Sequence, residues 1–262
     1  MPDRPIKWRI MHGLHRARLL HLVEMTQVLW RYLCRRPHEP EFRYFRKFPT
    51  TRGGLFLDVG ANIGQTALSL SIFRPDLRII AFEPNTALEN RLRWVRRIVG
   101  KRLTTRMTGV AERTATQVAY LPKVRGVPFL QEVTLDRSVL FAPQTQERFQ
   151  RVVGKDFPDG FSIEELQMRF ESLDELHLDP DVVKIDVQGC ESLALAGMRT
   201  TLERCRPLLM IEADLPEEAG RCAEFLREFG YRPFVYDSET DALRPWDGVA
   251  IGINLFFATD RS

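Results

Sequence analysis

The chain has 262 residues, of which 44% are hydrophobic and 28% are charged, with a net charge of +3. This length is enough for one α/β domain with a sizeable core and an appendage, and the hydrophobic content excludes disorder throughout. The four cysteines show no C-x-x-C pair and no zinc-ligand spacing with histidine, so they predict reduced thiols in a cytoplasmic protein.

The beginning of the chain differs in charge from the rest. Residues 1–52 carry a net charge of +8, and the remainder carries −5. Apolar residues recur at helical spacing between Ile10 and Leu33, which predicts an amphipathic helix of about 25 residues. It has no apolar run long enough to span a membrane and no signal-peptide core. We therefore expect a basic helical N-terminal extension at 1–50 and a second domain at 51–262.

Three surfaces could cover the apolar stripe of this extension. They are the domain itself, a second subunit in a homodimer, or an anionic membrane face, which would make the protein membrane-peripheral. Nucleic acid is not expected as a partner, because no aromatic residues are interleaved with the basic ones. For all three surfaces, deletion of residues 1–48 is expected to leave cofactor binding intact.

The most informative motif follows the first predicted strand, Leu55–Val59. A turn with Gly60, Asn62 and Gly64 comes next, and then a helix. Glycine permits a sharp turn and close approach to a ligand, and asparagine tolerates the left-handed conformation. Asp58, at the end of the strand, can accept a hydrogen bond from a ligand's ammonium or hold the loop through backbone N–H groups.

The glycine spacing separates two cofactor classes. A dinucleotide fingerprint would need glycine at Asn62 and at Gln65, so the match fails at two of three positions. The spacing instead matches the first motif of S-adenosylmethionine (SAM) methyltransferases, with Asn62 in place of the middle glycine. The N-terminus of the following helix would suit the carboxylate of the methionine moiety.

A second strand, Arg78–Phe82, leads into Glu83, and Asn85 follows two residues later. An acid at this distance from the glycines can accept hydrogen bonds from a ribose. A third strand is predicted within Leu103–Val110, and Glu112 after it would lie near an adenine.

The later part of the chain repeats the pattern of a strand that ends in an acid. A buried parallel strand ends in Asp186, a helix follows over Ser192–Arg199, and a fourth strand ends in Glu212. The four acids at strand ends predict a site at the carboxyl edge of an open sheet. Further strands are predicted at 166–170, 231–236 and 251–258, and residues 122–160 are predicted to form an insertion or lid.

The segments FLDVGANIGQT, AFEPN, VKIDVQGCESLALAGM and RPLLMIE together resemble the FkbM-type methyltransferases, from about Gly53 to the C-terminus. The resemblance implies a Rossmann-like class I methyltransferase fold with seven strands, the last antiparallel, and helices on both faces. It also implies a SAM-dependent O-methyltransferase that acts on a hydroxyl of a sugar, glycan or polyketide-type acceptor. Gln188 stands where the family often has glutamate.

The candidate catalytic residues are Asp186 and Glu191, with Asp186 preferred because it ends a strand beside the glycine loop. No metal site is predicted, although a divalent ion held by Asp186, Glu191 or Glu212 stays open as an alternative. Two other functions also stay open, a nucleic-acid methyltransferase and a catalytically silent SAM-fold binding module. The candidate cofactor-binding residues are Asp58, Gly60, Asn62, Gly64, Glu83, Asn85, Glu112 and Asp186.

Overall fold

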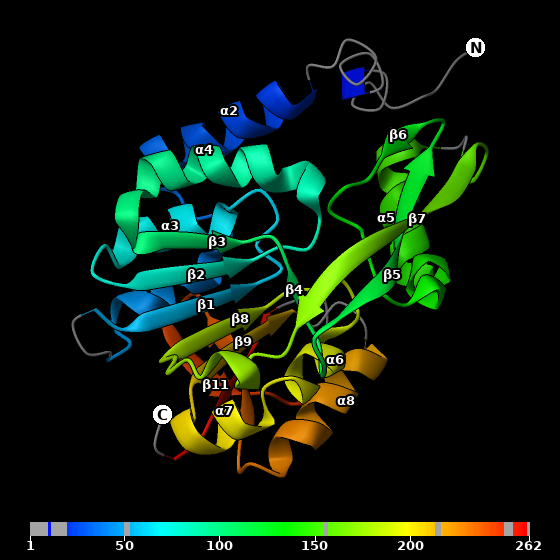
Figure 1. Ribbon diagram of the computed structural model, residues 1–262. Coiled ribbons are helices and arrows are strands. Elements are labelled where there is room, and N and C mark those ends of the chain that lie inside the picture. Colours follow the sequence, from blue (N-terminus) through cyan, green and yellow to red (C-terminus); the bar gives the residue numbers. More distant parts are fainter. Residues whose placement is uncertain are drawn as a thin grey trace.

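In the computed structural model of the protein, residues 10–11, 20–49, 53–154, 157–212, 216–248 and 254–260 are described. Their centre is an eight-stranded sheet in the order β11-β10-β12-β9-β8-β1-β2-β3 (Figure 1). The strands are β1 (Leu55–Val59), β2 (Arg78–Phe82), β3 (Leu103–Arg106), β8 (Val182–Ile185), β9 (Leu208–Glu212), β10 (Arg232–Asp237), β11 (Ala242–Pro245) and β12 (Asn254–Ala258).

The sheet is parallel from β3 to β9, and β12 runs antiparallel to both β9 and β10. The predicted Rossmann-like sheet with an antiparallel last strand is therefore confirmed. One strand was not predicted. It is β11, which pairs antiparallel with β10 at the edge of the sheet. The predicted strand at 251–258 is described from Asn254 onward, and residues 251–253 lie outside the described part of the chain.

Helices cover both faces of the sheet, as expected for parallel strands that are buried throughout. One face carries α2 (Leu20–Leu33), α3 (Gln65–Phe73) and α4 (Glu89–Val99), and the other carries α6 (Glu191–Ala196), α7 (Arg199–Cys205) and α8 (Pro216–Arg227) (Figure 1). β1 reads Leu-Phe-Leu-Asp-Val and is buried at all five positions, so its side chains supply both hydrophobic layers.

A second sheet of four strands stands beside the carboxyl ends of β1, β2 and β8 (Figure 1). Its strands are β4 (Gly109–Val110), β5 (Ala115–Val124), β6 (Val127–Pro128) and β7 (Phe161–Glu171), in the order β4-β7-β5-β6. We predicted 103–110 as one strand and placed 166–170 in the core, and both interpretations were wrong. β5 and β7 pair over ten residues and form an arm, which carries α5 (Pro143–Val153) and the 3-10 turn η4 (Arg137–Phe141).

The N-terminal extension is partly built into the core. Its predicted helix is described as α2, together with Ile10 and Met11, while residues 12–19 lie outside the described residues. Phe42 and Phe45, in the 3-10 helix η1 (Pro40–Arg46), are fully buried, and Phe45 packs edge-on against Phe56. The boundary at residue 50, drawn from charge, therefore does not coincide with the edge of the core. Short 3-10 turns also occur at η2 (Thr86–Leu88), η3 (Gly100–Arg102) and η5 (Asp174–Leu176).

Candidate active site

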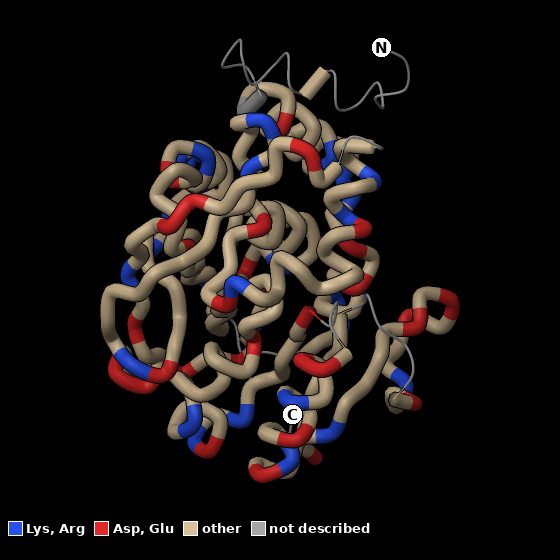
Figure 2. Tube along the Cα trace, turned by 90° about the vertical axis from the view of Figure 1, so that its right-hand side faces the viewer, with Lys and Arg blue, Asp and Glu red and all other residues tan. Residues whose placement is uncertain are grey.

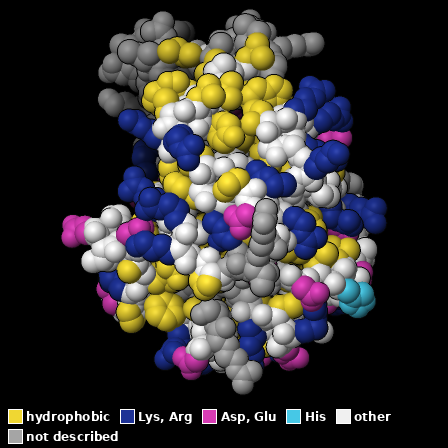
Figure 3. All heavy atoms as spheres, turned by 90° about the vertical axis from the view of Figure 1, so that its left-hand side faces the viewer, with side chains coloured by type: hydrophobic (Ala, Val, Ile, Leu, Met, Phe, Trp, Pro, Cys, Tyr) yellow, Lys and Arg dark blue, Asp and Glu magenta, His cyan; other side chains and the backbone are white. Residues whose placement is uncertain are grey.

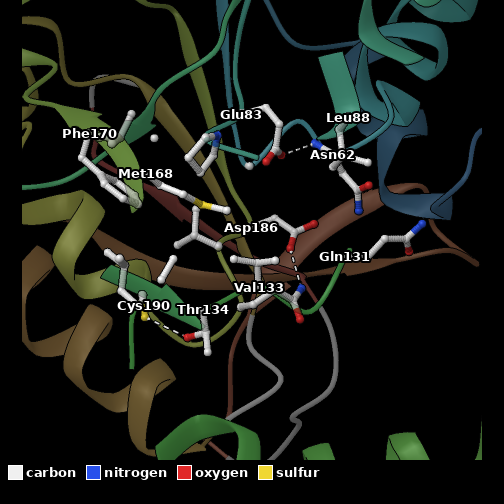
Figure 4. Close-up of a pocket in the computed structure, with 18 of the residues that line it drawn as sticks. Asn62, Glu83, Leu88, Gln131, Val133, Thr134, Met168, Phe170, Asp186 and Cys190 are labelled. Atoms are coloured by element: carbon white, nitrogen blue, oxygen red, sulfur yellow. Dashed lines mark hydrogen bonds between the residues drawn. The ribbon is translucent and has the colours of Figure 1, made fainter. Parts of the chain in front are cut away.

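A cavity lies at the carboxyl edge of the sheet, between the glycine turn after β1 and the arm (Figure 4). It encloses about 690 Å³ of space, which includes the open solvent at its mouth. Four of the predicted residues line it, namely Gly60, Asn62, Glu83 and Asp186.

The glycine turn brings the backbone close to the strand next to β1. Gly60 has φ +86°, and a Cβ atom there would come within 1.8 Å of the Asp186 carbonyl oxygen. Asn62 adopts the left-handed conformation predicted for it, with φ 53°. Gly64, at φ +88°, does not line the cavity, and a Cβ there would press on Val95 at 3.0 Å. Gly64 therefore allows α3 to start close to α4.

Glu83 is buried at the end of β2, and its carboxylate holds the walls of the cavity together. Oε2 accepts the Asn62 N–H at 2.8 Å, and Oε1 accepts the Asn85 N–H at 2.8 Å. Burial raises the pKa of Glu83 to about 7, and the two backbone hydrogen bonds only partly oppose this rise. Each oxygen keeps a lone pair, so the side chain can accept further hydrogen bonds from a ligand.

Asp186 is held ionised by a buried lysine. Lys184, one residue before the end of β8, is 1% exposed, and its Nζ lies 2.7 Å from Oδ2 of Asp186. Burial would raise the pKa of Asp186, but the Lys184 charge and hydrogen bonds with Glu212, Lys184 and Gln188 outweigh it and lower the pKa to about 2. The Gln188 amide donates at 3.1 Å to both Asp186 and Glu212, so it bridges two of the predicted strand-end acids.

The far wall of the cavity is apolar and comes from the arm and its connections. It includes Val110, Val133, Met168 and Phe170, with Leu88 on the opposite side (Figure 4). The sequence prediction missed these residues, because Val110, Met168 and Phe170 were assigned to strands at 103–110 and 166–170, and Val133 to the insertion or lid at 122–160. Cys190 also faces the cavity, where its thiol lies 3.3 Å from the Thr134 hydroxyl and burial raises its pKa.

Besides Gly64, three predicted cofactor residues do not line this cavity, namely Asp58, Asn85 and Glu112. Asp58 is fully buried, and burial raises its pKa to about 7, although the Lys184 charge and a hydrogen bond with the Thr66 side chain oppose this rise. Asn85 accepts the Ala87 N–H and so caps η2. The Glu112 side chain is 64% exposed and faces Arg113.

Glu191 holds the loop after Asp186. Its Oε1 accepts the Val187 and Gly189 N–H groups, each at 3.1 Å, and burial raises its pKa to about 7. It lines a small hollow with Arg148, Gln188 and Glu212, and Gln188 also lines the cavity described above. In the described part of the chain, no group of three or more His, Cys, Asp and Glu side chains is placed to hold a metal ion.

The N-terminal extension also places two titratable side chains, His38 and Glu39, where the Lys184 charge affects them, which the sequence did not reveal. Glu39 hydrogen-bonds the Asn254 side chain, and burial raises its pKa while the Lys184 charge lowers it. His38 bonds Ser69 at 2.8 Å, and burial together with the Lys184 charge lowers its pKa to about 3. Burial would lower the pKa of Lys184, but the carboxylates of Asp186, Glu39 and Asp58 together raise it.

The cavity suits a nucleoside cofactor that carries an amino-acid moiety. The backbone at Gly60 leaves no room for a side chain, Glu83 offers an ionisable acceptor, and the arm supplies an apolar wall for a base. Oδ1 of Asn62 is buried, faces this space and has no donor among the described residues, so it can accept from a ligand's ammonium.

This fold and site define the class of SAM-dependent methyltransferases. A model of the FkbM methyltransferase domain matches residues 58–233, which is more than half of the chain. The chain belongs to the FkbM methyltransferase family.

Solved structures agree with this fold. The chain is similar to methyltransferase FkbM from Methylobacillus flagellatus KT, with 18% identity and a TM-score of 0.52, over 84% of this chain and 50% of that one. It thus spans half the length of that neighbour. A SAM-dependent O-methyltransferase from Thermotoga maritima is more distant, with 14% identity and a TM-score of 0.42, over 86% of this chain and 65% of that one. No curated protein matches the sequence.

Proposed function

We propose that the protein transfers a methyl group from SAM to a hydroxyl oxygen of a sugar, glycan or polyketide-type acceptor. The observation that carries this proposal is the ionised carboxylate of Asp186 at the cavity edge, held by Lys184 at 2.7 Å and by Gln188 at 3.1 Å. A carboxylate that accepts hydrogen bonds is the complement of a hydroxyl, which donates one.

When bound, SAM would supply an electrophilic methyl group to the acceptor oxygen, which would lose its proton, and S-adenosylhomocysteine would be the second product. With a pKa of about 2, Asp186 is a weak base towards a free alcohol. Its first role is to orient the hydroxyl. An oxygen that is gaining a methyl group becomes far more acidic than a carboxylic acid, so Asp186 can accept the proton late in the transfer and pass it to water.

Glu83 and Asn62 would hold the cofactor, with Glu83 accepting from the ribose hydroxyls and Asn62 from the ammonium. The hollow that meets the cofactor cavity at Gln188, with Arg148, Glu191 and Glu212, would take the acceptor. Most of the side chains that line it are polar, which suits a polyhydroxylated group. Residues 122–160 supply Arg148, whose guanidinium contacts Glu132 at 2.7 Å and Gln188 at 3.2 Å, and so they would cover the acceptor as a lid.

The test is methyl transfer to a panel of glycosides, polyketide-type alcohols, amines and short nucleic acids, measured as S-adenosylhomocysteine formed. We expect turnover with a hydroxyl acceptor and none with the amines or nucleic acids. Turnover on an amine or a nucleic acid alone would contradict the proposal.

A further inference from the structure

The helix α2 is apolar on two sides, and the core accounts for only one of them. Val28 is buried, and Met25 and Tyr32 pack on the cluster that contains α3 and α4. On the outer side, Leu22, Trp30 and Leu33 are 51%, 57% and 69% exposed. A helix with apolar residues on two sides needs a second surface to cover the side that the core leaves exposed.

The surroundings of this outer stripe are basic. α2 lies beside α4, and Glu24 of α2 pairs with Arg91 of α4 at 2.9 Å (Figure 1). Residues 20–36 and 89–101 together hold eight Lys and Arg and two Asp and Glu, a net charge of +6. Both acids are already paired, Glu24 with Arg91 and Glu89 with Arg93.

Figure 3 shows the face at one end of α2 and α4. Hydrophobic side chains gather near α2, and Lys and Arg side chains are spread around and below them. The face seen in Figure 2, which includes the arm, carries both signs of charge. The exposed basic residues at the end of α2 are Arg31, Arg35 and Arg36, and those on α4 are Arg93, Arg96 and Arg97. Around α2 and α4, the exposed charges are therefore mainly basic.

We propose that α2 docks the protein on an anionic lipid surface, with Leu22, Trp30 and Leu33 inserted between headgroups and the arginines around them paired with lipid phosphates. This is the arrangement by which amphipathic helices bind in the plane of an interface. Trp30 suits the headgroup boundary because its ring is amphipathic, and Arg36 lies 5.8 Å from the centre of that ring.

The same charges argue against the other occupants of this surface. A twofold dimer through α2 would bring two copies of this surface together, each with a net charge of +6 over residues 20–36 and 89–101, which is repulsive. A nucleic acid would neutralise the arginines but would leave Trp30 and Leu33 in water. An anionic lipid surface satisfies both the charge and the apolar stripe. No helix among the described residues is long and apolar enough to cross a membrane.

The experiment is cosedimentation of the full chain with phosphatidylcholine vesicles that contain or lack phosphatidylglycerol. We expect binding only to the anionic vesicles, and we expect added salt to weaken it. Trp30→Ser with Leu33→Ser should abolish binding. Arg31→Gln with Arg36→Gln should weaken it by about fivefold per arginine, or about 25-fold for the pair.

Matched variants control for lost hydrophobicity and for lost charge elsewhere. Phe141→Ser with Leu193→Ser removes two exposed apolar side chains distant from α2, and Arg151→Gln with Arg227→Gln removes two exposed charges. Both pairs should bind like the parent protein. The proposal is overturned by absence of binding to anionic vesicles, by equal loss in the control pairs, or by a dimeric mass that becomes monomeric in Trp30→Ser with Leu33→Ser.

Discussion

The ammonium of Lys184 is buried 2.7 Å from the carboxylate of Asp186, only two residues further along the chain. The lysine lies on the face of β8 that packs against α3, and the aspartate lies just past the end of the strand. This pair holds an ionised carboxylate at the edge of the cofactor cavity. The first prediction concerns what the pair contributes to the free energy of unfolding.

Replacing Lys184 with methionine should lower the free energy of unfolding by up to about 3–5 kcal/mol, because it leaves the Asp186 side chain, which is only 23% exposed, without its charged partner. Lys123→Met, which breaks the partly exposed pair with Glu164, should cost under about 1 kcal/mol. Urea unfolding at neutral pH measures both. Equal costs for the two variants would contradict a structural role for the buried pair.

The same pair predicts a pH dependence. The pKa of Asp186 is about 2 in the folded protein, against about 3.9 in an unfolded chain. The folded state therefore binds fewer protons than the unfolded state in that interval. The stabilisation is complete above about pH 4 and is lost as the pH falls through about 2. Between pH 4 and pH 2, unfolding curves of the parent protein should lose more stability than those of Asp186→Asn.

Glu83 predicts proton release when SAM binds. Its pKa is raised to about 7, and hydroxyl groups that donate to the carboxylate favour the ionised form, so binding should lower this pKa. Near neutral pH, SAM binding should release a fraction of a proton, and affinity should rise with pH between about 6 and 8. Calorimetry in buffers of different ionisation enthalpy measures the release. Glu83→Gln should abolish it, and an unchanged release in that variant would assign the proton to another group.

Gly60 and Gly53 form a matched pair for testing the glycine turn. Both have positive φ, but a Cβ at Gly60 would meet the Asp186 carbonyl at 1.8 Å, while one at Gly53 would meet nothing within 4 Å. Gly53→Ala should cost about 1–2 kcal/mol of conformational strain. Gly60→Ala adds a backbone clash, so we expect a larger loss of stability and no SAM binding. Thermal unfolding and calorimetry decide this, and similar behaviour of the two variants would be evidence against the close approach at Gly60.

Asp186→Asn keeps the shape of the side chain and removes its charge. We expect turnover to fall by about two orders of magnitude or more, with little change in SAM affinity. Glu191→Gln is the comparison, because Glu191 bonds the loop amides at 3.1 Å and lines the proposed acceptor hollow but not the cofactor cavity. It should lower stability and raise the KM for the acceptor, with a smaller fall in turnover than Asp186→Asn gives. Full activity in Asp186→Asn would move the catalytic role elsewhere.

The extension gives a prediction that reverses a sequence-based expectation. Deletion of residues 1–48 was expected to leave cofactor binding intact, but it removes Phe42 and Phe45, which are fully buried. Each buried phenylalanine contributes about 3–5 kcal/mol relative to alanine. The truncated protein should therefore be unfolded or insoluble. A folded, SAM-binding truncation would show that η1 is dispensable.

The sequence predicted the parts of the site that depend on local rules. The turn at Gly60, the left-handed Asn62 and the acid at Glu83 follow from strand–turn–helix spacing, and all lie where expected. The arm was not predicted, because β5 and β7 pair across a long separation, and their alternation of buried and exposed residues does not reveal which sheet they join. Arg148 could not be predicted either, since its contact with Gln188 depends on how the arm folds back.

The sequence prediction assigned too many of the acids at strand ends to the cofactor site, for a related reason. A carboxylate at the end of a strand can face the ligand, as Asp186 does, or turn into the protein, as Asp58 does, and spacing alone does not distinguish the two. Lys184 had no sequence signal beyond a charge within an apolar run. Such a charge in a buried strand must have a partner, and Asp186 two residues later was the nearest candidate.

The most direct test of the site is a calorimetric titration of the intact protein with SAM and, separately, with NADH. The cavity at Gly60, Asn62 and Glu83 predicts saturable one-to-one binding of SAM, weakened in Glu83→Gln, and no binding of NADH. Absence of SAM binding in a folded preparation, or binding of NADH in its place, would contradict the assignment of this cavity.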